Sequence, residues 1–226
     1  MQDSKAKFSQ GIPMKYDYKK QEKTLYGAKT TPCVLEIPAQ NFITLTGIGN
    51  PNEEIFSHKV SALFSLAYAL KMAYKKSQLL QKDKNTGENI DDYAVYPLEG
   101  IWGKKQAAGH EQAKLDKDEL HYKIMICQPH FIGREHIEST KESLIKKKKL
   151  DYLTDIDFET MQEGKCVQML HKGAFDDEPK TFAIMDSYCL AHHLTRIDTI
   201  HTEIYLSNPH RTAPCNFKTI LRYRVR

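Results

Sequence analysis

A run of apolar residues at helical spacing, from Glu53 to Ser77, is the most regular pattern in the sequence. Acidic residues begin the run and lysines end it, which matches the two ends of a helix dipole. The apolar members recur mostly three to five positions apart, and they are Ile55, Val60, Leu63, Phe64, Ala67, Leu70 and Tyr74. The run therefore predicts a long amphipathic helix, which must bury its apolar face against another layer of structure.

Predicted strands flank this helix, and the same order of elements returns in the second half of the chain. The first strands cover 41–48, 92–97 and 120–129, with an irregular stretch at 98–118. A second round comprises a helix at 134–148, a strand at 166–171, a helix at 179–193 and strands at 201–206 and 217–225. The order strand-helix-strand-strand thus occurs approximately twice.

This recurrence predicts an α+β fold built from two fused modules, one at about 39–129 and one at about 134–226. We expect the modules to share one mixed or antiparallel sheet, with the long helices on one face. Residues 1–38 are polar and interrupted by prolines, which favours an irregular N-terminal leader that drapes over the fold.

The charged residues are nearly balanced, with 33 basic and 29 acidic residues and a formal net charge of +4. The basic residues are spread along the chain, whereas a nucleic-acid-binding face normally needs a clustered patch. We therefore expect no nucleic-acid partner for the chain by itself. No apolar stretch has the length of a signal peptide or a membrane span, so we predict a cytoplasmic protein with no membrane partner.

Motifs for common cofactors and metals are absent from the sequence. There is no glycine-rich phosphate loop, no HExxH motif and no GxSxG elbow. The five cysteines are odd in number and include no CxxC pair, which argues against a disulfide framework and a cysteine zinc site. A metal at His201 and Glu203 would lack an evident third ligand. We predict no metal and no organic cofactor.

The segment from His201 to Leu206 carries the strongest candidate for chemistry. Side chains alternate between the faces of a strand, so His201, Glu203 and Tyr205 share one face. The glutamate lies either on a solvent-exposed sheet face or among aromatic rings, which would suit flat, apolar or cationic ligands. The candidate rings are Tyr93 and Tyr96 on a neighbouring predicted strand, Trp102 in the loop after it, and Tyr223 near the C-terminus.

Four blocks of sequence together resemble the stand-alone GyrI-like small-molecule-binding family. They are IPAQNFITLTGIGNPNE, YPLEGIW, CVQMLHKGAFDDEPKTFAIMDSYC and HTEIYLSNPHRTAPCNFKTILRYRV, and the resemblance covers residues 16–226. It implies duplicated β-α-β-β (SHS2-type) modules with pseudo-two-fold symmetry around a central ligand groove. It also implies binding of bulky aromatic cations and similarity to hydrolases that open the cyclopropane ring of DNA-alkylating cyclopropanoid natural products.

The resemblance assigns the family's key acid to Glu203 and its accompanying tyrosine to Tyr205. The loop aromatic falls on Trp102, and Glu99 precedes it in the same block. Relatives often carry a second tryptophan where this chain has Gly103, which implies a wider pocket or weaker hydrolysis. A second departure, Cys215-Asn216 in place of an acidic-basic pair, lies in an expected surface turn.

Two functions follow from these residues. In the first, Glu203 deprotonates a water that attacks the strained cyclopropane carbon, and Tyr205 holds the water or the acid by hydrogen bonding. Trp102 and the pocket tyrosines then stack on the planar ligand. In the second, the same acid pairs with a lipophilic cation, and the protein sequesters or senses drugs without turning them over. A third interpretation is an open groove that binds a partner chain. The oligomeric state is left open by the sequence.

Overall fold

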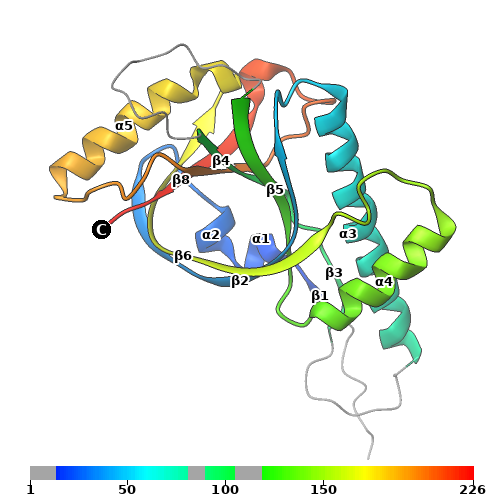
Figure 1. Cartoon of the computed structure of the whole chain (residues 1–226). Helices are drawn as coiled ribbons and strands as arrows, with labels where there is room; N and C mark the ends of the chain where they lie inside the picture. The colour runs from blue at the N-terminus through cyan, green and yellow to red at the C-terminus, as the bar shows by residue number, and fades with distance from the viewer. Residues whose placement is uncertain (1–13, 81–89, 105–118) are drawn as a thin grey trace, which may run out of the picture.

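The computed structural model of the chain describes residues 14–80, 90–104 and 119–226. In this part of the chain, strands form a closed barrel in the order β2-β5-β4-β7-β8-β6, with antiparallel neighbours throughout (Figure 1). The fold is therefore α+β with an antiparallel sheet, but the sheet is closed. The barrel strands are β2 (Cys33–Ile48), β4 (Leu98–Lys104), β5 (Leu120–Gln128), β6 (Asp157–Lys172), β7 (His201–Tyr205) and β8 (Lys218–Arg224).

Two long strands, β2 and β6, close the barrel. Each has 16 residues, and both begin well before the strands that the sequence pattern predicts. Pro38 and Gly164 lie in the unpredicted parts, and Pro38 is missing from the paired residues because proline has no N–H to donate, whereas Gly164, with a φ of 72°, pairs with Ile37. Pairing continues on both sides of Pro38 in the same register, so the expected antiparallel sheet closes into a barrel.

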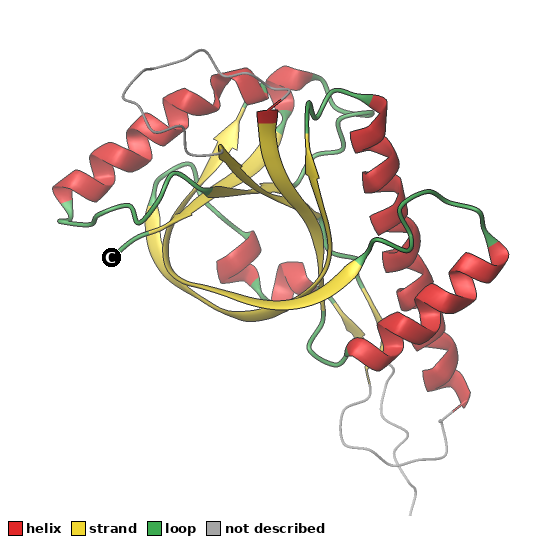
Figure 2. Cartoon of the chain, viewed as in Figure 1, coloured by secondary structure: helices red, strands yellow, loops and turns green. Residues whose placement is uncertain are grey.

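Among the described residues, three long helices lie outside the barrel (Figures 1 and 2). The helix α3 (Glu54–Leu80) confirms the predicted amphipathic helix, and its Leu63, Leu66 and Leu70 are buried. The helix α4 (Arg134–Lys147) packs beside α3, and α5 (Glu178–Ala191) covers β6 and β8. None of the described helices combines the length and apolar character that crossing a membrane requires.

The N-terminal segment enters the barrel and does not drape over it. The described part of the expected leader contains β1 (Met14–Tyr16), α1 (Tyr18–Gln21) and α2 (Lys23–Tyr26), while residues 1–13 lie outside the described residues. Both short helices lie within the ring of strands in Figure 2. Tyr18, Leu25 and Tyr26 are buried there, so these apolar side chains fill the interior of the barrel.

The expected strand at 92–97 is only partly correct. The strand β3 (Ile90–Tyr93) pairs in parallel with β1 and lies outside the barrel sheet. Its place in the barrel is taken by β4, within the stretch that the sequence predicts as irregular, so Trp102 lies on a strand and not in a loop. Gly100 and Gly103 conceal this strand because glycine weakens a strand pattern. Residues 105–118 of that stretch lie outside the described residues.

Candidate functional site

The strands β4 and β7 are neighbours, and their pairing divides the predicted site residues between two faces of the sheet. Gly100 lies opposite Glu203, and Trp102 lies opposite His201. Because side chains alternate along a strand, Trp102 and Glu203 share one face and Glu99 lies on the other. The first is the outer face, which α3 and α5 cover, and the second is the inner face, which lines the barrel.

On the outer face, the Trp102 indole is anchored to Tyr205. The indole Nε1 donates a hydrogen bond of 2.9 Å to the Tyr205 hydroxyl. Gly100 permits this contact, because a Cβ at that position would lie 2.6 Å from the indole nitrogen. Phe56 of α3 stacks on the indole at 6.0 Å, and Tyr122 of β5 packs against it at 5.6 Å. These contacts hold the only tryptophan of the chain in one orientation.

Glu203 lies at the centre of the outer-face cluster and is 9% exposed. Its Oε1 lies 3.0 Å from His201 Nε2, and its carboxylate also interacts with the Tyr205 hydroxyl. The Tyr205 oxygen accepts the Trp102 N–H, which leaves its own proton to be donated to Glu203. Burial, together with the negative charge of Glu203, raises the pKa of Tyr205 well above its usual range, so this hydroxyl keeps its proton.

A second carboxyl, Glu178, joins the outer-face cluster from the first position of α5. It is 7% exposed and lies near enough to Glu203 to feel its charge, while its Oε1 has no partner among the described residues. Burial, followed by the charge of Glu203, raises the pKa of Glu178 to about 9. No group of three or more His, Cys, Asp or Glu side chains in the described ranges is arranged to hold a metal ion.

Tyr223 also lies on the outer side of the sheet, beneath α5. Its hydroxyl donates a hydrogen bond of 2.8 Å to Asp186, and the Arg196 guanidinium lies 4.3 Å from the centre of its ring. Phe182 connects it to the Glu203 cluster, with ring distances of 6.3 Å to Tyr223 and 4.9 Å to His201. Tyr223 therefore holds α5 in place and contributes to the cluster through Phe182.

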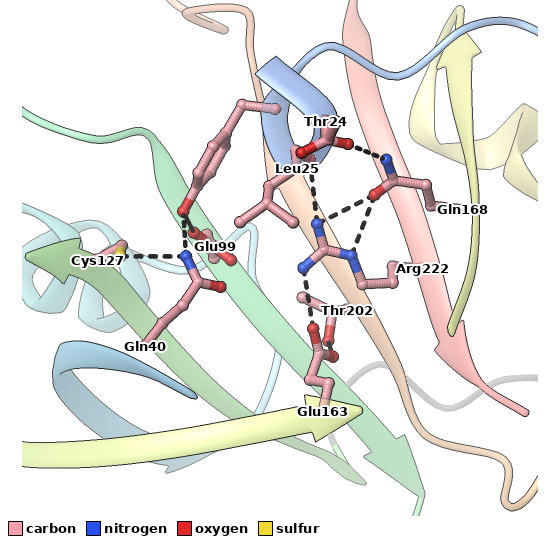
Figure 3. Close-up of polar contacts among 10 residues, drawn as sticks. Thr24, Leu25, Gln40, Glu99, Cys127, Glu163, Gln168, Thr202 and Arg222 are labelled. Carbon is pink, nitrogen blue, oxygen red and sulfur yellow. Dashed lines mark hydrogen bonds and ion pairs between the residues drawn. The ribbon is translucent and has the colours of Figure 1, made fainter. Parts of the chain in front are cut away.

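The inner face carries another buried acid, Glu99, which Figure 3 shows. Glu99 is 1% exposed and accepts a hydrogen bond of 3.0 Å from the Tyr26 hydroxyl of α2. Gln40 donates to the same hydroxyl at 3.2 Å. Burial raises the pKa of Glu99 to about 7, against the opposing charge of Arg222. Glu99 thus binds the N-terminal segment of the chain and lies across the sheet from Trp102.

Arg222 organises the rest of the inner-face cluster (Figure 3). Its guanidinium donates to Glu163 at 2.9 Å, to the Leu25 carbonyl at 3.1 Å and to Gln168 at 3.0 and 3.2 Å. Thr202 donates to Glu163 at 2.6 Å. Each guanidinium nitrogen therefore has an acceptor, and the buried positive charge is fully paired.

The other two predicted pocket tyrosines lie in separate clusters. Tyr96 stacks on Tyr18 with a ring distance of 4.6 Å, and its hydroxyl is hydrogen-bonded to Glu22. Tyr93 packs edge-on against Tyr74 of α3 at 5.9 Å. From the sequence we expect both beside Glu203, because their predicted strand is taken to be the neighbour of β7. The structure does not bring them there, because β3 pairs with β1.

An open hollow of about 680 Å³ lies at the ends of three barrel strands, and Ile101, Gly103 and Lys123 line it from the inner side of the sheet. Tyr122 lies between this hollow and Trp102. Gly103, where relatives often carry a second tryptophan, leaves the wall without a side chain, and a Cβ there would meet Ile200 at 3.4 Å. The lining residues are Thr46, Gly47, Ile48, Ile101, Gly103, His121, Tyr122, Lys123 and Ile200.

Sequence reasoning identified Trp102, Glu203 and Tyr205 of the outer face but missed Glu178 and Phe56. Phe56 belongs to the amphipathic run, and periodicity alone reads it as a packing residue. The sequence signal at Glu178 is only that of a helix start, because Pro179 follows it. Their contacts with Glu203 and Trp102 depend on how α5 and α3 dock on the sheet, which no local pattern specifies.

The barrel and its acid-and-aromatic outer face define an α+β domain of the small-molecule-binding class. A family model for the GyrI-like small molecule binding domain matches residues 30–226, and the chain belongs to this family. An uncharacterized conserved protein from Listeria innocua is 33% identical, with a TM-score of 0.79, and the match covers 93% of this chain and 100% of that one.

Two solved structures described as hydrolases from Listeria innocua are also similar. They are 31% and 32% identical to this chain, each with a TM-score of 0.78. The matches cover 93% and 94% of this chain and 100% of each relative. No curated protein gives a significant match.

Proposed function

We propose that the chain binds flat aromatic or cationic small molecules at its outer face and hydrolyses cyclopropanoid-type alkylating compounds there, as a detoxification activity. Glu203 is the general base, and Tyr205 and Trp102 hold it in position. The observation that carries this proposal is the hydrogen-bonded series from Trp102 through Tyr205 to Glu203. The similarity to two Listeria innocua proteins described as hydrolases, over nearly the whole chain, supports it.

The reaction adds one water across a strained carbon–carbon bond. Glu203 takes a proton from the water while the water oxygen bonds to the cyclopropane carbon. The ring bond breaks, and its electron pair passes into the conjugated ring system, whose oxygen takes up a proton. The overall change is a hydration, in which no electrons are gained or lost. A positioned general base contributes about 10² to 10⁴-fold to such a step, and ring strain lowers the remaining barrier.

Planar apolar surface beside the base supplies the binding energy. Tyr122 lines the hollow of about 680 Å³, a size that suits a drug-sized ligand, and its ring packs against Trp102 of the outer face. The missing side chain at Gly103 widens this hollow. Ligand rings that stack on Trp102 would place a reactive carbon near Glu203, and such positioning is worth a large part of a catalytic barrier.

Binding without turnover is the second candidate, and the charge at the outer face favours it. Neither Glu178 nor Glu203 forms an ion pair with a lysine or arginine of the described residues. A lipophilic cation would supply the missing positive charge, and the surrounding rings would attract it further. In this role the protein sequesters or senses drugs.

One experiment separates the two candidates. Purified protein is incubated with a cyclopropanoid alkylating compound, and the ring-opened hydrated product is measured by mass spectrometry. We expect Glu203→Gln to lose about 100-fold or more of the turnover. Glu142→Gln, a matched change at an exposed position on α4, should keep wild-type turnover. Equal turnover in Glu203→Gln and wild type contradicts the base assignment, and tight binding without product in either protein supports the binding role.

We also propose that residues 39–226 form one domain of two duplicated modules, at about 39–129 and 134–226. Apart from β3, which pairs outside the barrel, the order β2-α3-β4-β5 is followed, after α4, by β6-α5-β7-β8. Gly100 and Trp102 on β4 take the places of Glu203 and Tyr205 on β7, and Gly100 faces Glu203 across the strand pair. A pseudo-two-fold axis between β4 and β7 would relate the halves.

A further inference from the structure

The imidazole of His201 is in direct contact with the Glu203 carboxylate. Its Nε2 lies 3.0 Å from Glu203 Oε1, which is hydrogen-bond distance. An ionised carboxylate only accepts hydrogen bonds, so Nε2 carries the hydrogen of this bond and donates it. The two side chains are 21% and 12% exposed, so the bond is largely removed from water. A hydrogen bond to a charged group in such surroundings is stronger than one between neutral groups.

The strand β7 and its neighbour β4 bring three groups around the carboxylate. His201 and Tyr205 lie two residues before and after Glu203, so all three side chains share the outer face. Across the strand pair, Trp102 lies opposite His201 and Gly100 lies opposite Glu203. The indole passes over Gly100 to reach the Tyr205 hydroxyl at 2.9 Å. His201 and Tyr205 therefore flank Glu203 along the strand, and the indole lies across from it.

The ring of His201 is itself held by packing. Phe182 of α5 packs edge-on against it, with a ring distance of 4.9 Å. The Arg196 guanidinium lies 5.7 Å from the centre of the Phe182 ring and donates to the Ile200 carbonyl at 3.3 Å. Ile200 directly precedes His201, so these contacts fix both the backbone and the ring. The imidazole thus has a defined orientation toward Glu203.

The Glu203 carboxylate depends on such donors because it is buried. No lysine or arginine in the described part of the chain forms an ion pair with it. An unpaired carboxylate in these surroundings is costly, and the N–H of His201 reduces this cost. A carboxylate has about four acceptor positions, so one bond to His201 and one to Tyr205 leave positions for a water.

We propose that His201 is a positioning residue for Glu203, and that its donated hydrogen bond fixes the carboxylate in the orientation that activates water. This inference rests on the proposed function and deepens it. Glu203 takes the proton of the attacking water, while His201 keeps its Nε2 hydrogen throughout. His201 therefore acts through Glu203 and exchanges no proton with the substrate.

Two substitutions separate the hydrogen bond of His201 from its ring packing. His201→Phe keeps a ring against Phe182 but has no N–H to donate. His201→Gln keeps an N–H donor but has no ring. If the hydrogen bond positions Glu203, the glutamine variant is the more active of the two. If the ring only packs, the phenylalanine variant is the more active.

The test measures turnover of a cyclopropanoid alkylating compound, with kcat and KM determined separately. We expect His201→Phe to lose about 10 to 100-fold in kcat, with less than about threefold change in KM. His201→Gln should stay within about fivefold of wild type. His210→Phe, the same change at an exposed histidine after β7, should match wild type. The inference is overturned if His201→Phe has wild-type kcat, or if His201→Gln is the weaker variant.

A ligand-free measurement separates this inference from the proposed function. The free energies of unfolding of wild type, His201→Phe, Glu203→Leu and the double variant form a cycle that isolates the interaction of the two side chains. We expect a coupling of about tenfold in the unfolding equilibrium constant. Coupling without turnover in wild type supports the bond from His201 and contradicts the proposed hydrolysis. Turnover without coupling overturns the role of His201 alone. If a variant does not fold, His201→Leu or Glu203→Ala takes its place in the cycle.

Discussion

The two faces of β4 and β7 each carry a buried acid beside a tyrosine, yet the surroundings of the two acids differ. On the inner face, Glu99 accepts a hydrogen bond from Tyr26, and Arg222 is paired through all three of its guanidinium nitrogens. On the outer face, Glu203 meets a second carboxyl, Glu178, one oxygen of which has no partner among the described residues.

This difference distinguishes a structural cluster from a ligand site. A buried polar network whose members are satisfied fixes one arrangement of the chain. The inner network does this by attaching the N-terminal segment to the barrel through the Leu25 carbonyl and Tyr26. A buried network with unpaired negative charge is costly unless a proton or a ligand completes it. We therefore infer that the inner face stabilises the fold and that the outer face serves binding.

The largest expected effect is on stability, at the inner face. Arg222→Met removes the positive partner of a buried cluster and takes the donors away from Glu163 Oε2 and Gln168 Oε1. Such a loss typically costs about 3–5 kcal/mol. Chemical denaturation should show this shift in the free energy of unfolding. Arg224→Met is the matched control, because Arg224 pairs with Asp198 in a partly exposed salt bridge worth about 1 kcal/mol or less. Equal costs for the two variants would show that the inner cluster does not stabilise the fold.

The second effect is a pH dependence that belongs to Glu99. Its folded pKa of about 7 exceeds the ordinary 4.5, so the folded state retains a proton that the unfolded chain loses. The contribution to stability is complete below about pH 4.5 and is lost as pH rises to about 7. The total is on the order of 3 kcal/mol.

In Glu99→Gln, the free energy of unfolding should no longer fall with this contribution as pH rises from 4.5 to 7. The measurement is the free energy of unfolding at a series of pH values. A variant that keeps the full wild-type slope between pH 4.5 and 7 would disprove the assignment to Glu99. The window differs from that of Glu178, which extends to about pH 9. The two faces can therefore be distinguished in one set of titrations.

The third effect is smaller and concerns the close approach at Gly100. An alanine Cβ there would lie 2.6 Å from the Trp102 nitrogen, so Gly100→Ala should displace the indole and break its bond to Tyr205. We expect about a tenfold loss of cation affinity, because one hydrogen bond is lost. The fluorescence emission of Trp102 should also shift. Gly133→Ala is the control, since a Cβ at Gly133 meets nothing within 4 Å. An unchanged emission in Gly100→Ala would show that the indole does not depend on this glycine.

Local periodicity predicted the elements that one pattern specifies. The helical spacing of 53–77 identified α3, and the alternation from His201 onward put Glu203 and Tyr205 on one face. The strand β4 was missed because Gly100 and Gly103 interrupt its pattern. Gly100 is required by the site itself, because the indole of Trp102 lies against it.

Long-range pairing explains the remaining differences. The closure of the barrel depends on β2 meeting β6, which joins distant parts of the chain across Pro38 and Gly164. The contact of Glu178 with Glu203 depends on the docking of α5. Tyr93 and Tyr96 were expected beside Glu203 from strand order, but β3 pairs with β1. Such pairings are determined by packing of the whole chain, and no sequence window contains them.

The most direct test of the two-face account is a titration with methyl-phenylpyridinium, followed through quenching of Trp102 emission. Wild type, Glu203→Gln and Glu99→Gln are compared at one neutral pH, each confirmed as folded by circular dichroism. The account predicts at least a tenfold loss of affinity in Glu203→Gln, about 1.4 kcal/mol, and wild-type affinity in Glu99→Gln. Wild-type affinity in Glu203→Gln, with weakened binding in Glu99→Gln, would contradict it and place the ligand inside the barrel.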